Sequence, residues 1–187
     1  VMDAKKIFII TGSATNVFKD NVLNNTAKYK YTFRIMPINS TMLGHELVTY
    51  FGYLKSYMFA AKGVNITKAA IIREDLAWTV SIKAGLTAAL YAYYGISVIA
   101  DKAFDPATVT QENFNTYWQD INATGAQLAI PVISGPTGSM MTQGYNNSKP
   151  KCLVCGINVP SQYATYWTDT YGKCAYEITM MPIVNSS

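Results

Sequence analysis

The chain has 187 residues, of which 50% are hydrophobic and only 14% are charged, with a formal net charge of +4. That length suits one domain, or one domain with part of another, and it is long enough to bury a substantial core. The high apolar content and small net charge exclude an intrinsically disordered chain, and scattered basic residues disfavour a nucleic-acid partner.

Short apolar runs alternate with longer segments of helical periodicity along the chain. Two predicted strands, over residues 6–10 and 31–35, precede the longest predicted helix, Ser40–Lys62, whose apolar stripe ends at Gly63. Downstream, strands are predicted over residues 69–72, 96–100, 128–133, 152–155 and 176–180. Helices are predicted over residues 76–94, 110–123, 139–145 and 161–171. The apolar side of the first of these helices includes Trp78 and Tyr93.

The downstream strands are apolar without polar alternation, and they lie between helices. This pattern is typical of a parallel sheet covered on both faces. Because crossovers between parallel strands are right-handed, we predict an α/β fold with a doubly wound, mostly parallel sheet flanked by helices. The longest charge-free stretches, residues 84–100 and 121–148, are broken by glycine and hydroxyl residues, so neither is expected to span a membrane.

In such a sheet, ligands bind beyond the carboxyl ends of the strands, where the connecting loops converge. Four of these loops are small, rich in hydroxyl groups and partly aromatic: residues 11–15, 73–78, 134–139 and 156–160. Their donors, acceptors and stacking faces suit a small polar ligand.

The residues that could support an enzyme are few. Glu74 and Asp75 would allow a shared general-acid site, but a solvated loop pair beside Arg73 is favoured. His45 is the only histidine, and it lies within a predicted helix without an evident nucleophile beside it. Residues 134–139 resemble a phosphate loop but lack its lysine and glycine spacing. We therefore predict no catalytic residue and no cofactor.

The three cysteines, Cys152, Cys155 and Cys174, do not make a convincing metal or redox site. Cys152 and Cys155 are three residues apart in a predicted strand, so their side chains should point to opposite faces. Buried thiols, or one disulfide to Cys174 that leaves a thiol unpaired, are the favoured alternatives, and no metal is expected. Six Asn-X-Ser/Thr sequons favour a cell-surface protein.

The order of these elements resembles that of type I periplasmic solute-binding proteins, and the branched-chain amino-acid (Leu/Ile/Val) receptors of ABC transporters in particular. The resemblance lies in Ile9–Asn16, Tyr29–Arg34, Pro37 before the long helix, Ala69–Trp78 and Phe104–Pro106. It runs in register across nearly the whole chain. No single motif is diagnostic, and the ordered series carries the resemblance.

The resemblance implies two lobes that are joined by three crossings and close on a ligand like a hinge. Residues 1–38 would be residual lobe-1 strands and the first crossing, residues 39–182 the lobe-2 α/β domain, and residues 183–187 the start of the return hinge. The chain is thus expected to be a piece of a longer protein. The strands of residues 1–35 would lack their sheet partners, so we expect them to be disordered, packed on lobe 2 or paired with another chain in a dimer.

The resemblance also implies the residues that contact a ligand. The loop of Ser13, Ala14 and Thr15 would hold the α-carboxylate and α-amino groups, and Trp78 would replace an aromatic residue that is usually tyrosine. Ser134 stands where the subgroup offers an aromatic side chain that is absent here. Asn158 stands where leucine-type receptors place an acidic residue, and its neutral amide gives up a charge-assisted hydrogen bond. An amide, short peptide, carboxylate or other small solute is therefore expected rather than a standard α-amino acid.

The expected function is that of the solute-binding component of an ABC importer, which captures a small polar solute and delivers it to permease subunits. Its expected location is extracellular or periplasmic, with a membrane anchor in the full-length protein. The alternatives are a ligand-sensing receptor domain of the same architecture and a flavodoxin-like or nucleotide-binding enzyme domain, against which the missing Gly-x-Gly-x-x-Gly motif argues.

Overall fold

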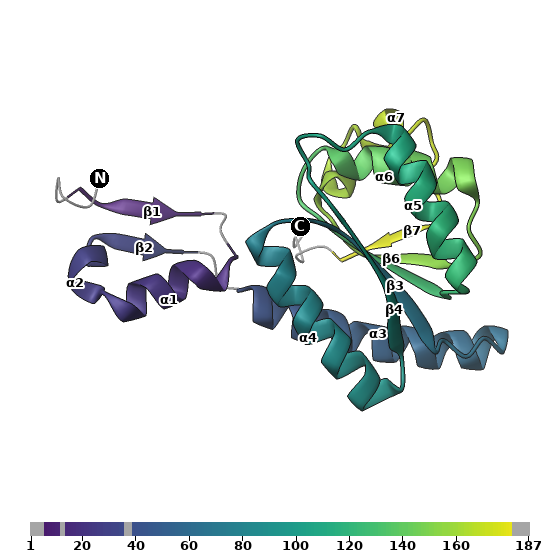
Figure 1. Ribbon diagram of the computed structural model, residues 1–187, viewed down its shortest axis with the longest axis horizontal. Helices are drawn as coiled ribbons and strands as arrows, with labels where there is room; N and C mark the ends of the chain where they lie inside the picture. The colour runs from purple at the N-terminus through teal and green to yellow at the C-terminus, as the bar shows by residue number, and fades with distance from the viewer. Residues whose placement is uncertain (1–5, 12–13, 36–38, 181–187) are drawn as a thin grey trace, which may run out of the picture.

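The computed structural model describes residues 6–11, 14–35 and 39–180. Its N-terminal unit contains strands β1 (Phe8–Ile10) and β2 (Thr32–Arg34) and helices α1 (Asn16–Asn24) and α2 (Thr26–Tyr29), and it lies beside a larger α/β unit (Figure 1). The two strands pair with each other in parallel and form a sheet of their own. They pack neither on the larger sheet nor in a complete sheet, and apolar side chains such as Ile9 (55% exposed) and Phe33 (52%) remain uncovered.

Helix α3 (Ser40–Lys62) has the predicted bounds because both of its ends are capped. The side chain of Asn39 accepts a hydrogen bond from the backbone N–H of Met42, which satisfies one of the free donors of the first turn. Gly63 ends the helix with φ of 66°, a left-handed conformation that glycine adopts without steric penalty.

The larger unit is built on a five-stranded sheet whose strands all run parallel, in the order β4-β3-β5-β6-β7. Its strands are β3 (Lys68–Glu74), β4 (Ser97–Phe104), β5 (Leu128–Ile133), β6 (Leu153–Asn158) and β7 (Glu177–Thr179). The predicted α/β fold with a parallel sheet is confirmed.

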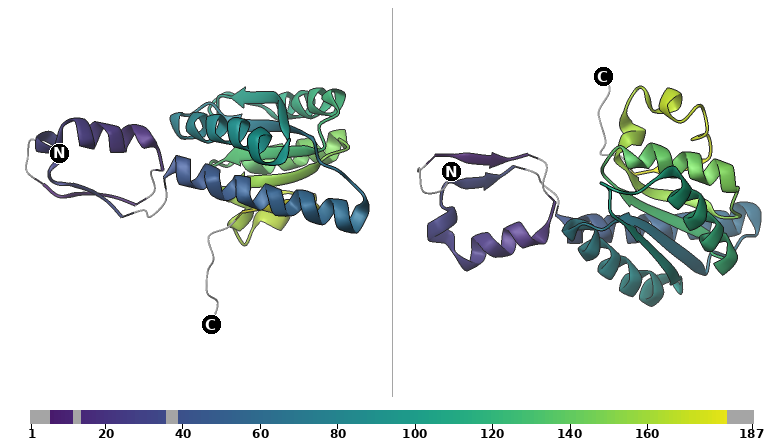
Figure 2. Two further views of the ribbon diagram at one scale, coloured as in Figure 1. Left: turned by 90° about the horizontal axis from the view of Figure 1, so that it is seen from below. Right: turned by 45° about the horizontal axis from the view of Figure 1, so that its top comes forward.

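Helices cover both faces of this sheet (Figure 2). Helices α3 and α4 (Ala77–Tyr94) bury Phe51 and Leu86 in one core, to which β3 contributes Ile71. Helices α5 (Gln111–Thr124) and α6 (Thr137–Ser148) form the other core, which contains Trp118 and, from β3, Ile72. Because successive residues of β3 point to opposite faces and both faces are covered, the strand has no polar alternation.

Several sequence predictions differ from the structure. The predicted helix over residues 161–171 is wrong: the segment contains a 3-10 turn, Val159–Gln162, and a short helix α7, Tyr166–Asp169, because Tyr163 between them has an extended backbone. Strand β4 continues beyond residue 100 to Phe104, whose side chain is buried under α5. Tyr93, predicted on the apolar side of α4, is 71% exposed.

The three cysteines are free thiols. Cys152 and Cys155 are buried in the two different cores, as their spacing on a strand predicts, while Cys174 is half-buried. Burial raises the pKa of both Cys152 and Cys155 to about 12. These two thiols are therefore protonated and unreactive in the folded protein.

Candidate functional site

The candidate site is the edge of the larger sheet where the parallel strands end. Strands β3, β5 and β6 are neighbours there, and the register places Ile133 of β5 opposite Asn158 of β6. Ser134 follows Ile133 directly, and Trp78 lies in the first turn of the helix that follows β3. Helix α1 of the N-terminal unit contacts α4, so the two units meet beside this edge.

Glu74, the last residue of β3, is only 1% exposed. Its carboxylate accepts hydrogen bonds from the Ser134 hydroxyl (2.7 Å to Oε2) and from the backbone N–H of Gly135 (2.8 Å to Oε1). A Cβ atom at Gly135 would lie 3.0 Å from Oε1, so glycine permits this close approach. The prediction that Glu74 and Asp75 form a solvated pair is therefore wrong for Glu74, while Asp75 is exposed.

The Glu74 carboxylate also bears on the alternative of a phosphate loop at residues 134–139. In phosphate loops, free backbone N–H groups cradle the anion. Here the Gly135 N–H is already bonded to the buried Glu74 side chain, so it is not free to bind a phosphate. The geometry of this turn thus disfavours the nucleotide-binding alternative.

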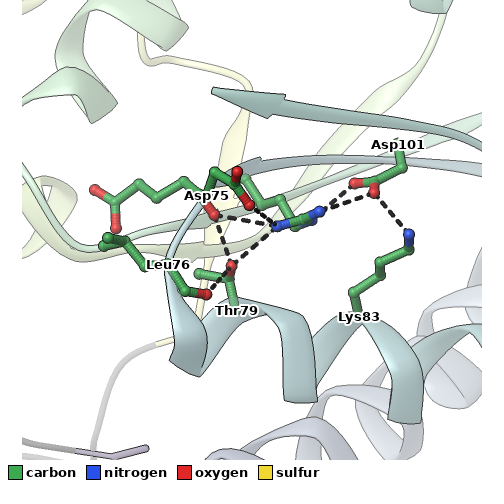
Figure 3. Close-up of polar contacts among 7 residues, drawn as sticks. Asp75, Leu76, Thr79, Lys83 and Asp101 are labelled. Atoms are coloured by element: carbon green, nitrogen blue, oxygen red, sulfur yellow. Dashed lines mark hydrogen bonds and ion pairs between the residues drawn. The ribbon is translucent and has the colours of Figure 1, made fainter. Parts of the chain in front are cut away.

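Arg73, one residue earlier on β3, belongs to a hydrogen-bonded network that joins this strand to Asp101 of β4 and Thr79 of α4 (Figure 3). Its guanidinium donates to both carboxylate oxygens of Asp101 (Nε–Oδ1 2.9 Å, Nη2–Oδ2 3.1 Å) and to the hydroxyl of Thr79 (3.3 Å). Lys83 approaches Asp101 from α4 at 2.8 Å. This bidentate pair fixes the end of β3 against its neighbours.

In the Arg73 network, partial burial and ion pairing shift the pKa values of the charged groups in opposite directions. Burial would raise the pKa of Asp101, but the hydrogen bonds and charges of Arg73 and Lys83 outweigh it and hold this pKa below its usual range. Burial would lower the pKa of Arg73, but the hydrogen bonds and charges of Asp101 and Asp75 together outweigh it, so the pKa of Arg73 is raised. Both groups are therefore ionised at neutral pH.

Asn158 ends β6 with its side chain inside the fold, 0% exposed. Its amide nitrogen donates to Glu177 (2.6 Å) and to the hydroxyl of Tyr166 (2.7 Å). The pKa of Tyr166 is raised by burial and by the nearby Glu177 charge. Contact between Asn158 and a solute stays a prediction. The buried amide oxygen of Asn158 has no hydrogen-bond partner among the described residues and is the atom that could accept from a solute.

The loop after β1 is the part of the candidate site that lies in the N-terminal unit. Thr15 caps α1, and its hydroxyl oxygen accepts from the backbone N–H of Val17 (3.3 Å). The carbonyl of Ala14 accepts from both the backbone N–H and the hydroxyl of Ser40 (2.8 Å each). Ser13, predicted with them, lies outside the described residues.

Trp78 and Ser134 differ in their surroundings. Trp78 is half-buried and packs against the core between the sheet and helices α3 and α4, so part of its side chain has a packing role. Ser134 is exposed at the end of β5. The structure thus brings Ser134 and Asn158 to adjacent strand ends, places Trp78 on the next helix, and leaves Ala14 and Thr15 in the other unit.

Sequence reasoning missed Glu177 and Tyr166, the partners of Asn158, because they come from β7 and the irregular segment before it. It also missed Asp101, which was expected just beyond the end of its strand. The signal for Glu74 was its position directly after a buried apolar strand.

Among residues 6–11, 14–35 and 39–180, no group of three or more histidine, cysteine or acidic side chains could hold a metal ion. A cavity of about 420 Å³ lined by Lys55, Phe59, Tyr93 and Tyr94 lies between α3 and the C-terminal end of α4, at the amino edge of the sheet. None of the helices described is both long and apolar enough to cross a membrane.

No family model matches the chain, and no curated protein matches its sequence. Solved structures do resemble it, although at low sequence identity. One of them is described as a branched-chain amino acid ABC transporter protein from Silicibacter pomeroyi. It has 14% sequence identity and a TM-score of 0.69, and the match covers 92% of this chain and 41% of that one.

Two further structures were determined with ligands. A solute binding protein of an ABC transporter from Rhodopseudomonas palustris, in complex with 3,4-dihydroxybenzoic acid, has 14% identity and a TM-score of 0.62 over 83% of this chain and 38% of that one. An ABC transporter substrate-binding protein from Desulfitobacterium hafniense, in complex with Leu, has 11% identity and a TM-score of 0.59 over 84% and 41%.

The chain spans about two-fifths of the length of these proteins. At this level of identity the comparison establishes the fold, which the chain shares with the solute-binding proteins of ABC transporters.

Proposed function

We propose that the chain is part of the extracytoplasmic solute-binding component of an ABC importer. Residues 39–182 would form lobe 2, residues 1–38 the end of lobe 1 with the first crossing, and residues 183–187 the start of the return hinge. A small polar solute would bind between the lobes and be delivered to permease subunits, without catalysis.

The observation that carries this proposal is the position of the strand-end loops. Ser134 and Trp78 lie in the larger unit, at the carboxyl edge of its parallel sheet. The Thr15 loop lies in the N-terminal unit, after the end of β1. This edge is where ligands bind in open α/β sheets. Contact between α1 and α4 supports an arrangement in which two lobes could close on a solute.

The solute that we propose is a small molecule with a carboxylate. Leu and 3,4-dihydroxybenzoic acid, which two of the similar structures contain, share that group. In this chain, Thr15 and the N-terminus of α1 would meet it. The Thr15 oxygen accepts from Val17, which leaves the hydroxyl proton to be donated, and the positive end of a helix favours an anion.

Isothermal titration of the full-length two-lobed protein with L-leucine, leucinamide, benzoate and 3,4-dihydroxybenzoate tests this proposal. We expect saturable binding of at least one carboxylate, and no binding of any small polar solute would contradict it. Trp78→Leu, which keeps apolar volume but removes the aromatic face, should weaken binding by about threefold to tenfold. The matched control is Trp167→Leu, at a tryptophan that is 61% exposed on α7, and it should leave binding unchanged.

A further inference from the structure

Glu74 and Ser134 form a hydrogen-bonded pair at the carboxyl edge of the larger sheet. Glu74 is a buried carboxylate, yet none of the ion pairs among the described residues includes it. Its neighbour Arg73 is committed to Asp101 and Asp75 instead. Within the part of the chain that the structure describes, the carboxylate is held by the Ser134 hydroxyl and the Gly135 N–H, one on each oxygen.

A serine hydroxyl has one proton to donate, and an ionised carboxylate can only accept. At 2.7 Å from Oε2 of Glu74, the proton of Ser134 is committed to that carboxylate. Ser134 is exposed at the strand-end edge, so its oxygen presents only lone pairs to anything that binds there. The Gly135 N–H holds the other carboxylate oxygen and thereby fixes the orientation of this arrangement.

We propose that Ser134 is a hydrogen-bond acceptor for the solute, and that Glu74, by fixing the Ser134 proton, makes this lobe select solutes that present an N–H or O–H donor at that position. The inference rests on the proposed function. Glu74 acts through Ser134 and is a positioning residue. A solute acceptor placed at Ser134 would face only the lone pairs of the hydroxyl oxygen and would be left desolvated and unpaired.

Thr15 has the opposite polarity. Its oxygen already accepts from the Val17 N–H, so its own proton is free to be donated. The Thr15 side therefore suits an acceptor such as a carboxylate, and the Ser134 side suits an ammonium, amide N–H or hydroxyl group. Together the two sides select a solute class: small carboxylates that carry a separate hydrogen-bond donor.

Glu74→Gln reverses the polarity of Ser134 while it keeps the shape of the side chain. The Gly135 N–H needs an acceptor, so the glutamine oxygen takes that position and its amide N–H₂ faces Ser134. The hydroxyl then accepts from the amide and turns its proton toward the solute. Ser134→Ala removes the hydroxyl altogether and leaves Oε2 of the buried Glu74 without that donor, so folding of this variant is also checked by circular dichroism.

The test is titration of the full-length two-lobed protein with matched probes: L-leucine against 4-methyl-2-oxopentanoate, and 4-hydroxybenzoate against 4-fluorobenzoate. In each pair, one member carries a donor that the other lacks. The unmodified protein should prefer the donor member by about tenfold or more. Glu74→Gln should abolish or reverse that preference, Ser134→Ala should abolish it, and Glu112→Gln on the exposed face of α5 should leave it intact.

The two failures are distinguishable. If none of the probes binds the unmodified protein, the proposed function fails, and this inference fails with it. If the unmodified protein binds them but shows no donor preference, or if Glu74→Gln folds normally by circular dichroism and keeps the preference unchanged, the inference alone is overturned.

Discussion

Asp101 provides a sharp test of how the strand-end edge is held together. Its carboxylate receives two hydrogen bonds from Arg73, whose side chain is 9% exposed, and an ion pair from Lys83. Asp101→Asn removes the negative charge with almost no change of shape. The buried guanidinium of Arg73 then has one acceptor oxygen, that of the substituted amide, at this position. Asp75, which is 65% exposed, is its remaining counter-ion.

The size of the effect follows from the burial of the pair. Removing one partner of a fully buried ion pair costs about 3–5 kcal/mol, because the other charge stays buried and uncompensated. The Asp101 side chain is 21% exposed, and Asp75 still faces Arg73 at 3.3 Å, so part of that penalty is relieved. We expect the free energy of unfolding to fall by about 2–3 kcal/mol.

Urea unfolding of the 187-residue chain at about neutral pH, followed by circular dichroism, measures this loss. The matched control is Asp120→Asn, which breaks a pair with Lys102 that is equally short (2.6 Å) but whose aspartate is 50% exposed. Exposed pairs contribute about 0–1 kcal/mol. If Asp101→Asn costs no more than Asp120→Asn, the Arg73 network does not stabilise the sheet as argued.

The pH dependence gives an independent check. The pKa of Asp101 is lowered in the folded protein, because the bonds from Arg73 and Lys83 outweigh the effect of burial. Its contribution to stability is therefore present above the unfolded pKa of about 3.9 and is lost as the pH falls through the lower folded value. The stability difference between the unmodified chain and Asp101→Asn should be full near neutral pH and shrink in acid. A difference that grows in acid would contradict this assignment.

Two further predictions concern the packing of β6 and the thiols. Gly156→Ala places a methyl group 2.4 Å from the carbonyl oxygen of Pro131 on β5, so the free energy of unfolding should fall by about 1–3 kcal/mol or more in urea unfolding. Cys152 and Cys155 are buried with a pKa of about 12, whereas Cys174 is half-buried. A thiol reagent at mildly alkaline pH should modify one cysteine per folded chain and three in urea, as counted by mass spectrometry.

The substitution at Gly156 has a matched control, and both measurements have an outcome that would contradict the argument. Gly85→Ala, inside α4 with no atom within 4 Å of the added methyl group, should stabilise the chain by about 0.5–1 kcal/mol, since alanine is the better helix former. Equal losses at Gly156 and Gly85 would mean that the close contact with β5 is not decisive. Rapid modification of all three thiols in the folded chain would mean that the sheet opens readily.

The candidate site was only partly predictable. Thr15 and Ser134 each follow the carboxyl end of a parallel strand as expected, although the two strands, β1 and β5, belong to different sheets. The burial of Glu74 could not be read from the chain, because it depends on the Ser134–Gly135 turn that faces it from β5, which is 60 residues away. Asn158 is turned inward for the same kind of reason: Glu177 and Tyr166 reach its amide from later segments.

The sequence by itself determined most helices and strands of the larger unit and that its sheet is parallel, but not helices α1 and α2 or the irregular segment of residues 159–171. Local signals suffice for this: Asn39 and Gly63 cap the longest helix, and the lack of polar alternation in β3 means that both of its faces are covered. Only the tertiary structure decided which polar groups are neighbours across strands, because hydrogen-bond partners distant in sequence are fixed by strand order and register. That is why the direction of the Ser134 proton, on which the proposed solute class rests, is a property of the folded chain.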